Sequence, residues 1–281
     1  MCRFIAYKGD RILLSDLVTN PSNSLINQSA HARERSEPLN GDGFGLGWYV
    51  PEVSAEPCLF TSVTPAWANQ NLRRIASKTV SPCIFAHVRA ATAGLEVNDL
   101  NCHPFQFGQY LWMHNGCIGG FRNIKRTLRK DLKDEYYHAV HGTTDSEHAF
   151  ALFLNYLPDT EKQMSGEVLA DTLAKTVSHI STLCQQSAVT PRLVLNFAVT
   201  DGRSVVATRF SSNDEPASLY LCTGEEYNCT EGACQIISGK KKKFVIIASE
   251  PITKLREQWI RVPEHHLVHL QENLDVVMRK L

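Results

Sequence analysis

Hydrophobic and polar residues follow two different periods along the chain. Apolar residues three and four positions apart predict helices at 22–28, 66–77, 120–129, 145–156 and 166–185. Runs rich in β-branched and aromatic residues predict strands, and these lie at 3–7, 45–50, 83–88, 110–114, 193–200, 204–210, 219–222, 244–248 and 267–270. The helix at 145–156 has a capping signal in front of it, because Thr144 is followed by Glu147 three residues later.

The order of these elements favours a layered α+β fold over a repeated βαβ unit. Strands dominate both ends of the chain and helices lie between them. No glycine-rich nucleotide loop follows a predicted strand, and the sequence contains no internal repeat or low-complexity linker. We therefore expect one continuous domain over residues 2–281.

Composition excludes several classes of partner. The chain has 29 basic and 29 acidic residues, so no overall charge attracts it to nucleic acid or to an anionic membrane. No apolar run approaches the roughly 18 residues of a membrane span, and the N-terminus lacks the layout of a signal peptide. We expect a cytoplasmic protein that binds neither nucleic acid nor membrane.

The nine cysteines do not form a recognisable framework. Their number is odd and none of them forms a CxxC pair, which argues against both a disulfide scaffold and a zinc ribbon. Cys222, Cys229 and Cys234 are near one another in sequence, but their irregular spacing does not favour a metal site. Reduced thiols are the expected state.

Cys2 is the first candidate for catalysis, because it directly follows the initiator methionine. Removal of Met1 is expected next to so small a side chain, and it would leave Cys2 with a free α-amino group of pKa roughly 7.7–8.0. That amine can accept the thiol proton of the same residue, directly or through a water. A second-position cysteine can also be incidental, so its interpretation depends on the rest of the chain.

A glycine-rich segment at 40–49 and an arginine within the apolar segment 85–92 are further candidates for the site. Four glycines in 40–49 indicate a tight turn that enters a strand and packs closely against its surroundings. Arg89 stands among apolar residues in 85–92. A buried arginine needs an anionic partner, and its planar fork matches a carboxylate. The alternative for Arg89 is an internal ion pair.

The pair Asn115-Gly116 and the single residue Asp145 are the remaining candidates. Asn115 and Gly116 follow a predicted strand and offer an amide N–H and an unobstructed backbone N–H, the donors of an oxyanion hole. Asp145, near a helix start, could accept hydrogen bonds from a ligand ammonium. A turn at Asn115-Gly116 and an N-cap role for Asp145 are the structural alternatives. Together with Cys2 and Arg89, these residues would suit the two charges of an α-amino acid.

With these motifs in order, the chain resembles the class-II glutamine amidotransferases of the N-terminal-nucleophile hydrolase superfamily. Cys2 matches the nucleophile, Arg89 the carboxylate-binding arginine, Asn115-Gly116 the oxyanion hole and Asp145 the ligand of the glutamine amine. Segments 26–29, 40–49, 56–58, 64–67 and 101–105 resemble a stand-alone branch that includes a component of the yeast glutathione-degrading complex, and 248–251 with Trp259 resembles the family's closing strand region.

The resemblance implies a four-layer αββα sandwich and hydrolysis of a γ-glutamyl amide through a glutamyl thioester, without metal or organic cofactor. Thr92 would assist the substrate carboxylate, whereas His87, His103 and His114 are interpreted mainly as packing groups. Glutathione or a related γ-glutamyl compound is the leading substrate. The chain has no room for an acceptor domain, so a separate peptidase or synthetase subunit is a candidate partner.

Three rival interpretations remain. The first is a glutamine amidase that supplies ammonia to a separate partner. The second is a non-catalytic subunit that binds γ-glutamyl compounds, which the presence of Cys2 and Asn115 disfavours. The third is a metal-dependent hydrolase using His138, His141, Asp145 and His148, whose spacing could bring several ligands to one helix face, although Gly142 interrupts that helix.

Overall fold

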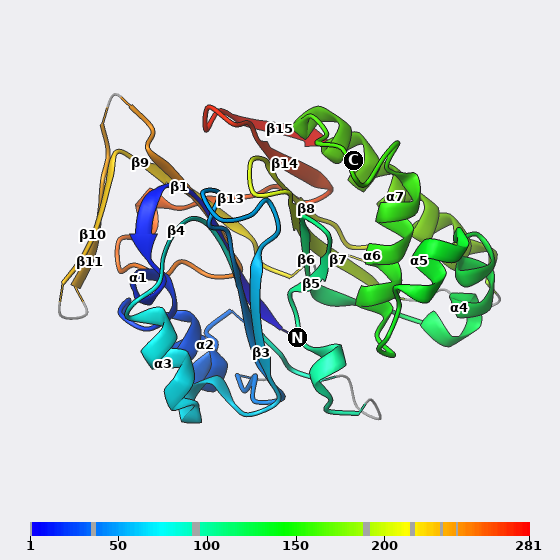
Figure 1. The fold of residues 1–281 in the computed structure, drawn as a ribbon, viewed down its shortest axis with the longest axis horizontal. Helices are drawn as coiled ribbons and strands as arrows, with labels where there is room; N and C mark the ends of the chain where they lie inside the picture. Colours follow the sequence, from blue (N-terminus) through cyan, green and yellow to red (C-terminus); the bar gives the residue numbers. More distant parts are fainter. Residues whose placement is uncertain are drawn as a thin grey trace.

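Two antiparallel sheets lie at the centre of the structure, a computed structural model that describes residues 2–34, 38–91, 96–187, 192–213, 217–230, 233–239 and 241–281 (Figure 1). The first sheet has the order β13 (Ile260–Arg261), β9 (Tyr220–Gly224), β12 (Phe244–Ala248), β1 (Arg3–Leu13), β4 (Val80–Val88), β2 (Phe44–Trp48) and β3 (Cys58–Ser62). The second has the order β15 (Val276–Lys280), β14 (His266–Leu270), β8 (Val205–Arg209), β7 (Leu193–Thr200), β6 (Tyr110–Ile118) and β5 (Phe105–Phe107).

Helices cover the outer face of each sheet (Figure 1). The first sheet carries α1 (Ser15–Val18), α2 (Leu25–His31) and α3 (Gln70–Ala76), and the second carries α4 (Phe121–Lys130), α5 (Asp134–His138), α6 (Asp145–Tyr156) and α7 (Gly166–Gln186). Short 3-10 turns lie at Ala66–Ala68, Asp99–Asn101 and Arg256–Gln258, and β10 (Glu226–Thr230) pairs with β11 (Ala233–Ile237) as a separate hairpin.

Side-chain alternation along the strands produces the layers. In β1, Phe4 and Ala6 face the second sheet, whereas Ile5 and Tyr7 pack against the helices of the first. Successive side chains of a strand point to opposite faces, so a strand that is apolar at every position is buried on both sides. The predicted α+β fold with four αββα layers is therefore confirmed.

The predicted elements differ from the structure mainly at their ends. The helix at 145–156 and the strands at 193–200 and 244–248 have the predicted bounds. Thr144 caps α6, accepting a hydrogen bond from the Glu147 N–H at 3.2 Å. The helix expected at 66–77 is instead divided, because Asn69 caps a new helix by accepting from the Leu72 N–H at 2.9 Å. Strand β1 continues to Leu13, six residues beyond its predicted end.

The expectation that all cysteines are reduced is wrong for one pair. A disulfide joins Cys229 to Cys234 across the β10–β11 hairpin. The two residues are direct partners in the antiparallel register, with their Cα atoms 4.0 Å apart. The sequence spacing gave no sign of this pairing, because the hairpin itself was not predicted.

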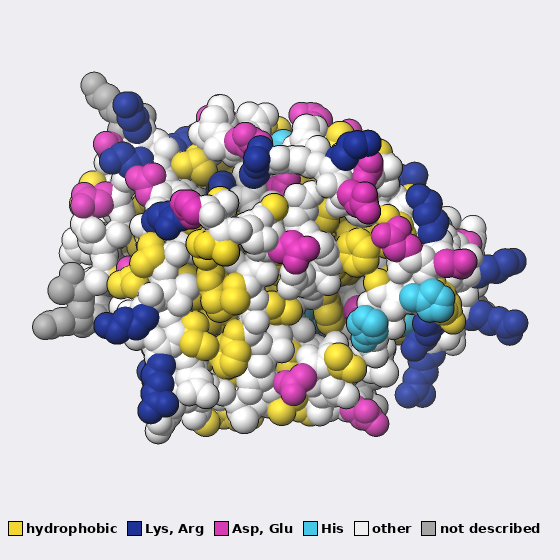
Figure 2. All heavy atoms as spheres, in the orientation of Figure 1, with side chains coloured by type: hydrophobic (Ala, Val, Ile, Leu, Met, Phe, Trp, Pro, Cys, Tyr) yellow, Lys and Arg dark blue, Asp and Glu magenta, His cyan; other side chains and the backbone are white. Residues whose placement is uncertain are grey.

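Basic side chains gather at one end of the molecule, over α4 (Figure 2). This ten-residue helix has no acidic residue and carries five cations, Arg122, Lys125, Arg126, Arg129 and Lys130. The balanced overall charge of the chain thus includes a local excess of positive charge. None of the helices in the described ranges has the length and apolar character that crossing a membrane requires.

Candidate active site

Cys2 lies immediately before β1, with 8% of its surface exposed. Its Sγ atom is 3.4 Å from the backbone N of Ala90 and 3.7 Å from the Ala90 carbonyl oxygen. Within the described residues the thiol has no other hydrogen-bond partner, and in particular no histidine. This arrangement fits a thiol whose base is not a distant side chain.

A buried ion pair fixes the backbone next to Cys2. Arg3 Nε lies 2.7 Å from Glu250 Oε1, and both side chains are almost fully buried. The same arginine donates from Nη1 to the Cys2 carbonyl oxygen at 2.9 Å. Glu250 also accepts from the backbone N–H groups of Arg33 and Glu34 at 3.0 Å. Removing one member of such a pair costs about 3–5 kcal/mol, because the other charge is left buried.

Arg89 follows the last residue of β4 and is 3% exposed. Its guanidinium contacts two neutral acceptors, the Asp42 carbonyl oxygen at 3.5 Å and the Glu96 carbonyl oxygen at 3.3 Å. The Asp42 carboxylate is occupied elsewhere, accepting from the Ala91 N–H at 2.8 Å. Arg89 has no carboxylate partner among the described residues, so the alternative of an internal ion pair is not supported. Thr92, expected to assist Arg89, lies outside those residues.

Asn115 and Gly116 lie within β6, which ends only at Ile118, so the alternative that they form a turn is wrong. Asn115 is fully buried. Its Nδ2 atom is 3.3 Å from Ser249 Oγ, while its Oδ1 atom has no hydrogen-bond partner in the described structure. Asn115 is thus a buried amide with one terminal atom bonded and the other left for a ligand.

The backbone of Gly116 is suited to donate a hydrogen bond. A side chain here would collide with the Val194 carbonyl oxygen, so only glycine fits against β7. The Gly119 N–H turns back to Arg192 next to β7, whereas the Ile118 N–H points away from β7 to Asp145. N–H groups two residues apart on a strand share a direction, so the Gly116 N–H points toward the side on which Asp145 lies.

Asp145 is the first residue of α6 and is half-buried. The alternative that Asp145 is the N-cap is wrong, because Thr144 occupies that position. Its Oδ2 atom accepts from the Ile118 N–H at 2.7 Å and its Oδ1 atom from the Ser146 N–H at 2.9 Å. No cationic side chain pairs with it in the described part of the chain, so its negative charge is open to a ligand.

Asn101 links the surroundings of Arg89 to those of Asp145. Its Nδ2 donates to the Glu96 carbonyl oxygen at 3.2 Å, the same atom that Arg89 contacts. Its Oδ1 accepts from the Thr143 N–H at 2.9 Å, two residues before Asp145. The sequence alone assigns no role to Asn101, Ser249 or Glu250, although all three lie in the segments 101–105 and 248–251 that resemble the family.

The three buried histidines pack beside the site. Burial lowers the pKa of His87 to about 3 and lowers the pKa of His103 and of His114 from the usual value. The rings of His87 and His103 stack with centroids 4.2 Å apart. His114 Nδ1 lies 2.8 Å from the hydroxyl of Ser146, the residue after Asp145. All three are neutral groups at neutral pH, in keeping with the packing role predicted for them.

The four proposed metal ligands do not share a helix. His138 ends α5, whereas Asp145 and His148 belong to α6. His148 Nδ1 lies 2.7 Å from the Thr144 carbonyl oxygen, and burial lowers the pKa of this histidine to about 4. In the ranges that the structure describes, no three His, Cys, Asp or Glu side chains are placed to hold a metal ion.

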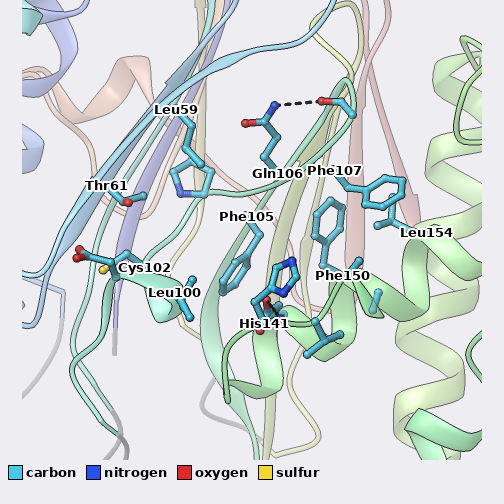
Figure 3. Close-up of a pocket in the computed structure, with 17 residues that line it drawn as sticks. Leu59, Thr61, Leu100, Cys102, Phe105, Gln106, Phe107, His141, Phe150 and Leu154 are labelled. Carbon is cyan, nitrogen blue, oxygen red and sulfur yellow. Dashed lines mark hydrogen bonds between the residues drawn. The ribbon is translucent and has the colours of Figure 1, made fainter. Parts of the chain in front are cut away.

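A cavity of about 520 Å³ lies between β3, β5 and α6. Figure 3 shows Phe105, Phe107 and Phe150 on one of its sides and Cys102 on another. Neither Cys2, Arg89, Asn115 nor Asp145 lines this cavity. The catalytic candidates therefore belong to a separate place, although α6 and the turn at Asp99–Asn101 contribute to both.

Comparison with known proteins identifies relatives over the whole chain. Residues 13–279 match the family model described as glutamine amidotransferases class-II, a range that begins after Cys2. The probable glutamine amidotransferase DUG3 of Saccharomyces cerevisiae is 41% identical over 97% of this chain and 82% of its own length. A gamma-glutamyl-hercynylcysteine sulfoxide hydrolase of Mycobacterium tuberculosis is 34% identical over 97% of this chain and 94% of its own.

Solved structures share the fold. A glutamine aminotransferase class-II domain protein from Silicibacter pomeroyi superposes with a TM-score of 0.68 at 24% identity, covering 100% of this chain and 99% of that chain. The glutamine phosphoribosylpyrophosphate amidotransferase of B. subtilis superposes with a TM-score of 0.61 at 13% identity, and the match spans 99% of this chain but 49% of that enzyme. At these identities the likeness concerns the fold alone.

Proposed function

Because the chain belongs to the class-II glutamine amidotransferases, an enzyme family that acts on C–N amide bonds, we propose that it hydrolyses a γ-glutamyl amide with Cys2 as nucleophile. The observation that carries this proposal is a pair of opposite charges, one next to the residue that contacts the thiol and the other next to the strand that carries Asn115 and Gly116. Arg89 adjoins Ala90, which contacts Cys2, and Asp145 is bonded to Ile118, two residues from Gly116. Neither charge has an ion-pair partner among the described residues, and the two ends of an α-amino acid complement them.

In the proposed reaction the α-amine of Cys2 accepts the thiol proton, and the thiolate attacks the γ-carbonyl carbon. The side chain of Asn115 and the N–H of Gly116 donate to the oxygen as it becomes negative. The protonated amine then gives its proton to the leaving amine as the C–N bond breaks. Water hydrolyses the glutamyl thioester, which releases glutamate and regenerates the thiol. Arg89, assisted by Thr92, holds the α-carboxylate, and this sequence requires neither metal nor organic cofactor.

Glutathione or a related γ-glutamyl compound is the substrate we propose. The name of the Mycobacterium tuberculosis relative supports the γ-glutamyl class as a whole. Free glutamine is the second candidate, because the matching family is described by its use of glutamine. We place the enzyme in the cytoplasm as one domain over residues 2–281, with a separate peptidase or synthetase subunit as candidate partner. A non-catalytic binding role would leave the arrangement around Cys2 and Asn115 without a purpose.

A product assay on the purified protein tests this function. Glutamine, glutathione and other γ-glutamyl amides are incubated with the protein, with and without cellular extract, and released glutamate, ammonia and amine are measured. We expect glutamate together with the free amine from glutathione. Release of ammonia from glutamine alone would favour the second candidate. If no γ-glutamyl compound yields glutamate under either condition, the proposed activity is wrong.

The two charged anchors give a separate prediction. Arg89→Lys keeps the charge but loses the bidentate fork, and Asp145→Asn removes the charge that faces the ammonium. Each should lower kcat/KM by roughly 10- to 100-fold, the effect of one hydrogen bond to a charged group. The measurement is steady-state kinetics on a substrate with a free α-amino acid end.

Truncated substrates provide matched controls for these variants. 4-Aminobutanamide lacks the α-carboxylate, so wild type and Arg89→Lys should cleave it at equal rates. Glutaric acid monoamide lacks the α-amine, so wild type and Asp145→Asn should cleave it equally. Wild-type kcat/KM for either variant on the complete substrate would show that its residue has only a structural role.

A further inference from the structure

We infer that Ser249 is a positioning residue that orients the Asn115 amide, an inference that rests on the proposed function. Ser249 directly follows β12 and is fully buried. Its Oγ atom accepts from the Phe4 N–H at 3.0 Å, and its own N–H donates to the Phe4 carbonyl oxygen at 3.0 Å. The same Oγ lies 3.3 Å from the amide of Asn115. One hydroxyl therefore joins the strand that follows Cys2 to the oxyanion donor.

The two ends of an asparagine amide are distinguished by their hydrogen bonds and not by their shape. With Nδ2 toward Ser249, the Oδ1 of Asn115 is a buried acceptor without a donor. Turning the amide by 180° lets the Ser249 hydroxyl donate to Oδ1, while Ser249 still accepts from Phe4. The atom left over is then Nδ2, a donor. An oxyanion hole needs a donor at that place, since an oxygen there would repel the developing negative charge.

The residue opposite Asn115 favours the same orientation. Asn196 is the direct partner of Asn115 in the β6–β7 register, so the two side chains lie on one face of the sheet. Asn196 donates from Nδ2 to the carbonyl oxygens of Ala217 and Ser218, at 3.1 and 3.3 Å. These bonds fix the orientation of its amide, so its Oδ1 is a second buried acceptor without a donor. A buried oxygen without a donor is costly on each of these two neighbouring residues, and turning Asn115 removes one of the two.

The hydroxyl of Ser249 is therefore the group whose hydrogen bond holds Asn115 in the productive orientation, which Asn196 also favours. Without this hydroxyl, only the neighbouring Asn196 favours that orientation, and Asn115 would turn its oxygen toward the substrate for a larger share of the time. Ser249→Ala should then slow the chemical step by about tenfold, the loss of one aligned hydrogen bond, and leave substrate affinity unchanged. Ser249→Thr keeps the hydroxyl and should restore the rate.

A double-mutant cycle tests this inference. A glutamine analogue with a diazoketone at the γ-position serves as the probe, and the rate of Cys2 labelling at saturating probe is measured for wild type, Ser249→Ala, Asn115→Ala and the double variant. We expect Ser249→Ala to slow labelling by about tenfold in the wild-type background and to change it less than about twofold once Asn115 is alanine.

Ser218→Ala is the matched control. The Ser218 hydroxyl donates to the Ser249 carbonyl oxygen at 2.8 Å, so its loss perturbs the same backbone, while no hydrogen bond joins it to Asn115. Ser218→Ala should change the rate of Cys2 labelling by the same factor whether residue 115 is asparagine or alanine. An equal effect of Ser249→Ala in both backgrounds would assign Ser249 a purely structural role and overturn the inference. Failure of wild-type protein to label at Cys2 would instead contradict the proposed function itself.

Discussion

Protein that retains a residue in front of Cys2 should lose turnover while keeping its fold. An acylated amine cannot accept the thiol proton, and the described structure offers Cys2 no histidine in its place. General-base catalysis contributes about 10²–10⁴-fold, and we expect a loss of at least that size in kcat. The measurement is kcat on samples whose first residue has been verified by mass spectrometry.

A cleavable N-terminal tag provides the matched control for this prediction. Proteolysis that leaves Cys2 as the first residue should restore activity in the same preparation, and thermal unfolding should be alike before and after cleavage. Full activity in the uncleaved protein would remove the N-terminal amine from the mechanism. Loss of the folding transition in the tagged protein would show that the tag disturbs the fold instead.

Asn115→Ala should lower kcat by roughly 10²–10³-fold, equivalent to about 3–4 kcal/mol, with little change in KM. The reason is that the amide donor gains most of its strength when the substrate oxygen becomes negative. Steady-state kinetics separate the two parameters. Because Asn115 is fully buried within β6, thermal unfolding must be measured alongside to exclude a folding defect.

Peptide mapping completes this prediction. The diazoketone analogue should label Cys2 in wild-type protein and label it slowly in Asn115→Ala. A label found on another of the nine cysteines would assign the nucleophile elsewhere. An unchanged kcat in Asn115→Ala would remove that residue from the oxyanion hole.

Elements with a strong local signal could be predicted from the sequence, and α6 is the clearest of them. The Thr144 cap and the apolar run after it are both local, and the helix has the predicted bounds. Strand β3 was missed because it is a partly exposed edge strand without a continuous apolar run. The end of β1 was not predicted because the polar, partly exposed stretch 8–11 interrupts the apolar run before Ile12 and Leu13, which resembles a loop.

The residues proposed for the site stand out in the sequence more clearly than the contacts that surround them. Arg89 and Asp145 stand out by residue type in their surroundings, so their sequence context is informative. The partners that position Cys2 and Asn115 are not local: Ser249 lies 134 residues from Asn115, and Glu250 lies 247 residues from Arg3. A single sequence carries no signal for contacts over such separations.

The pairing of Arg3 with Glu250 also has a consequence for biosynthesis. Strand β1, which follows Cys2, leaves the ribosome before β4 and β12, the two strands between which it lies, and it is anchored by Glu250, 247 residues after Arg3. Because synthesis runs from the N-terminus, a nascent chain exposes its thiol for most of its translation without the backbone anchor or the Ser249 hydroxyl. The proposed nucleophile is therefore made well before the residues that hold its surroundings in place, so we expect a chain that ends before Ser249 and Glu250 to be inactive.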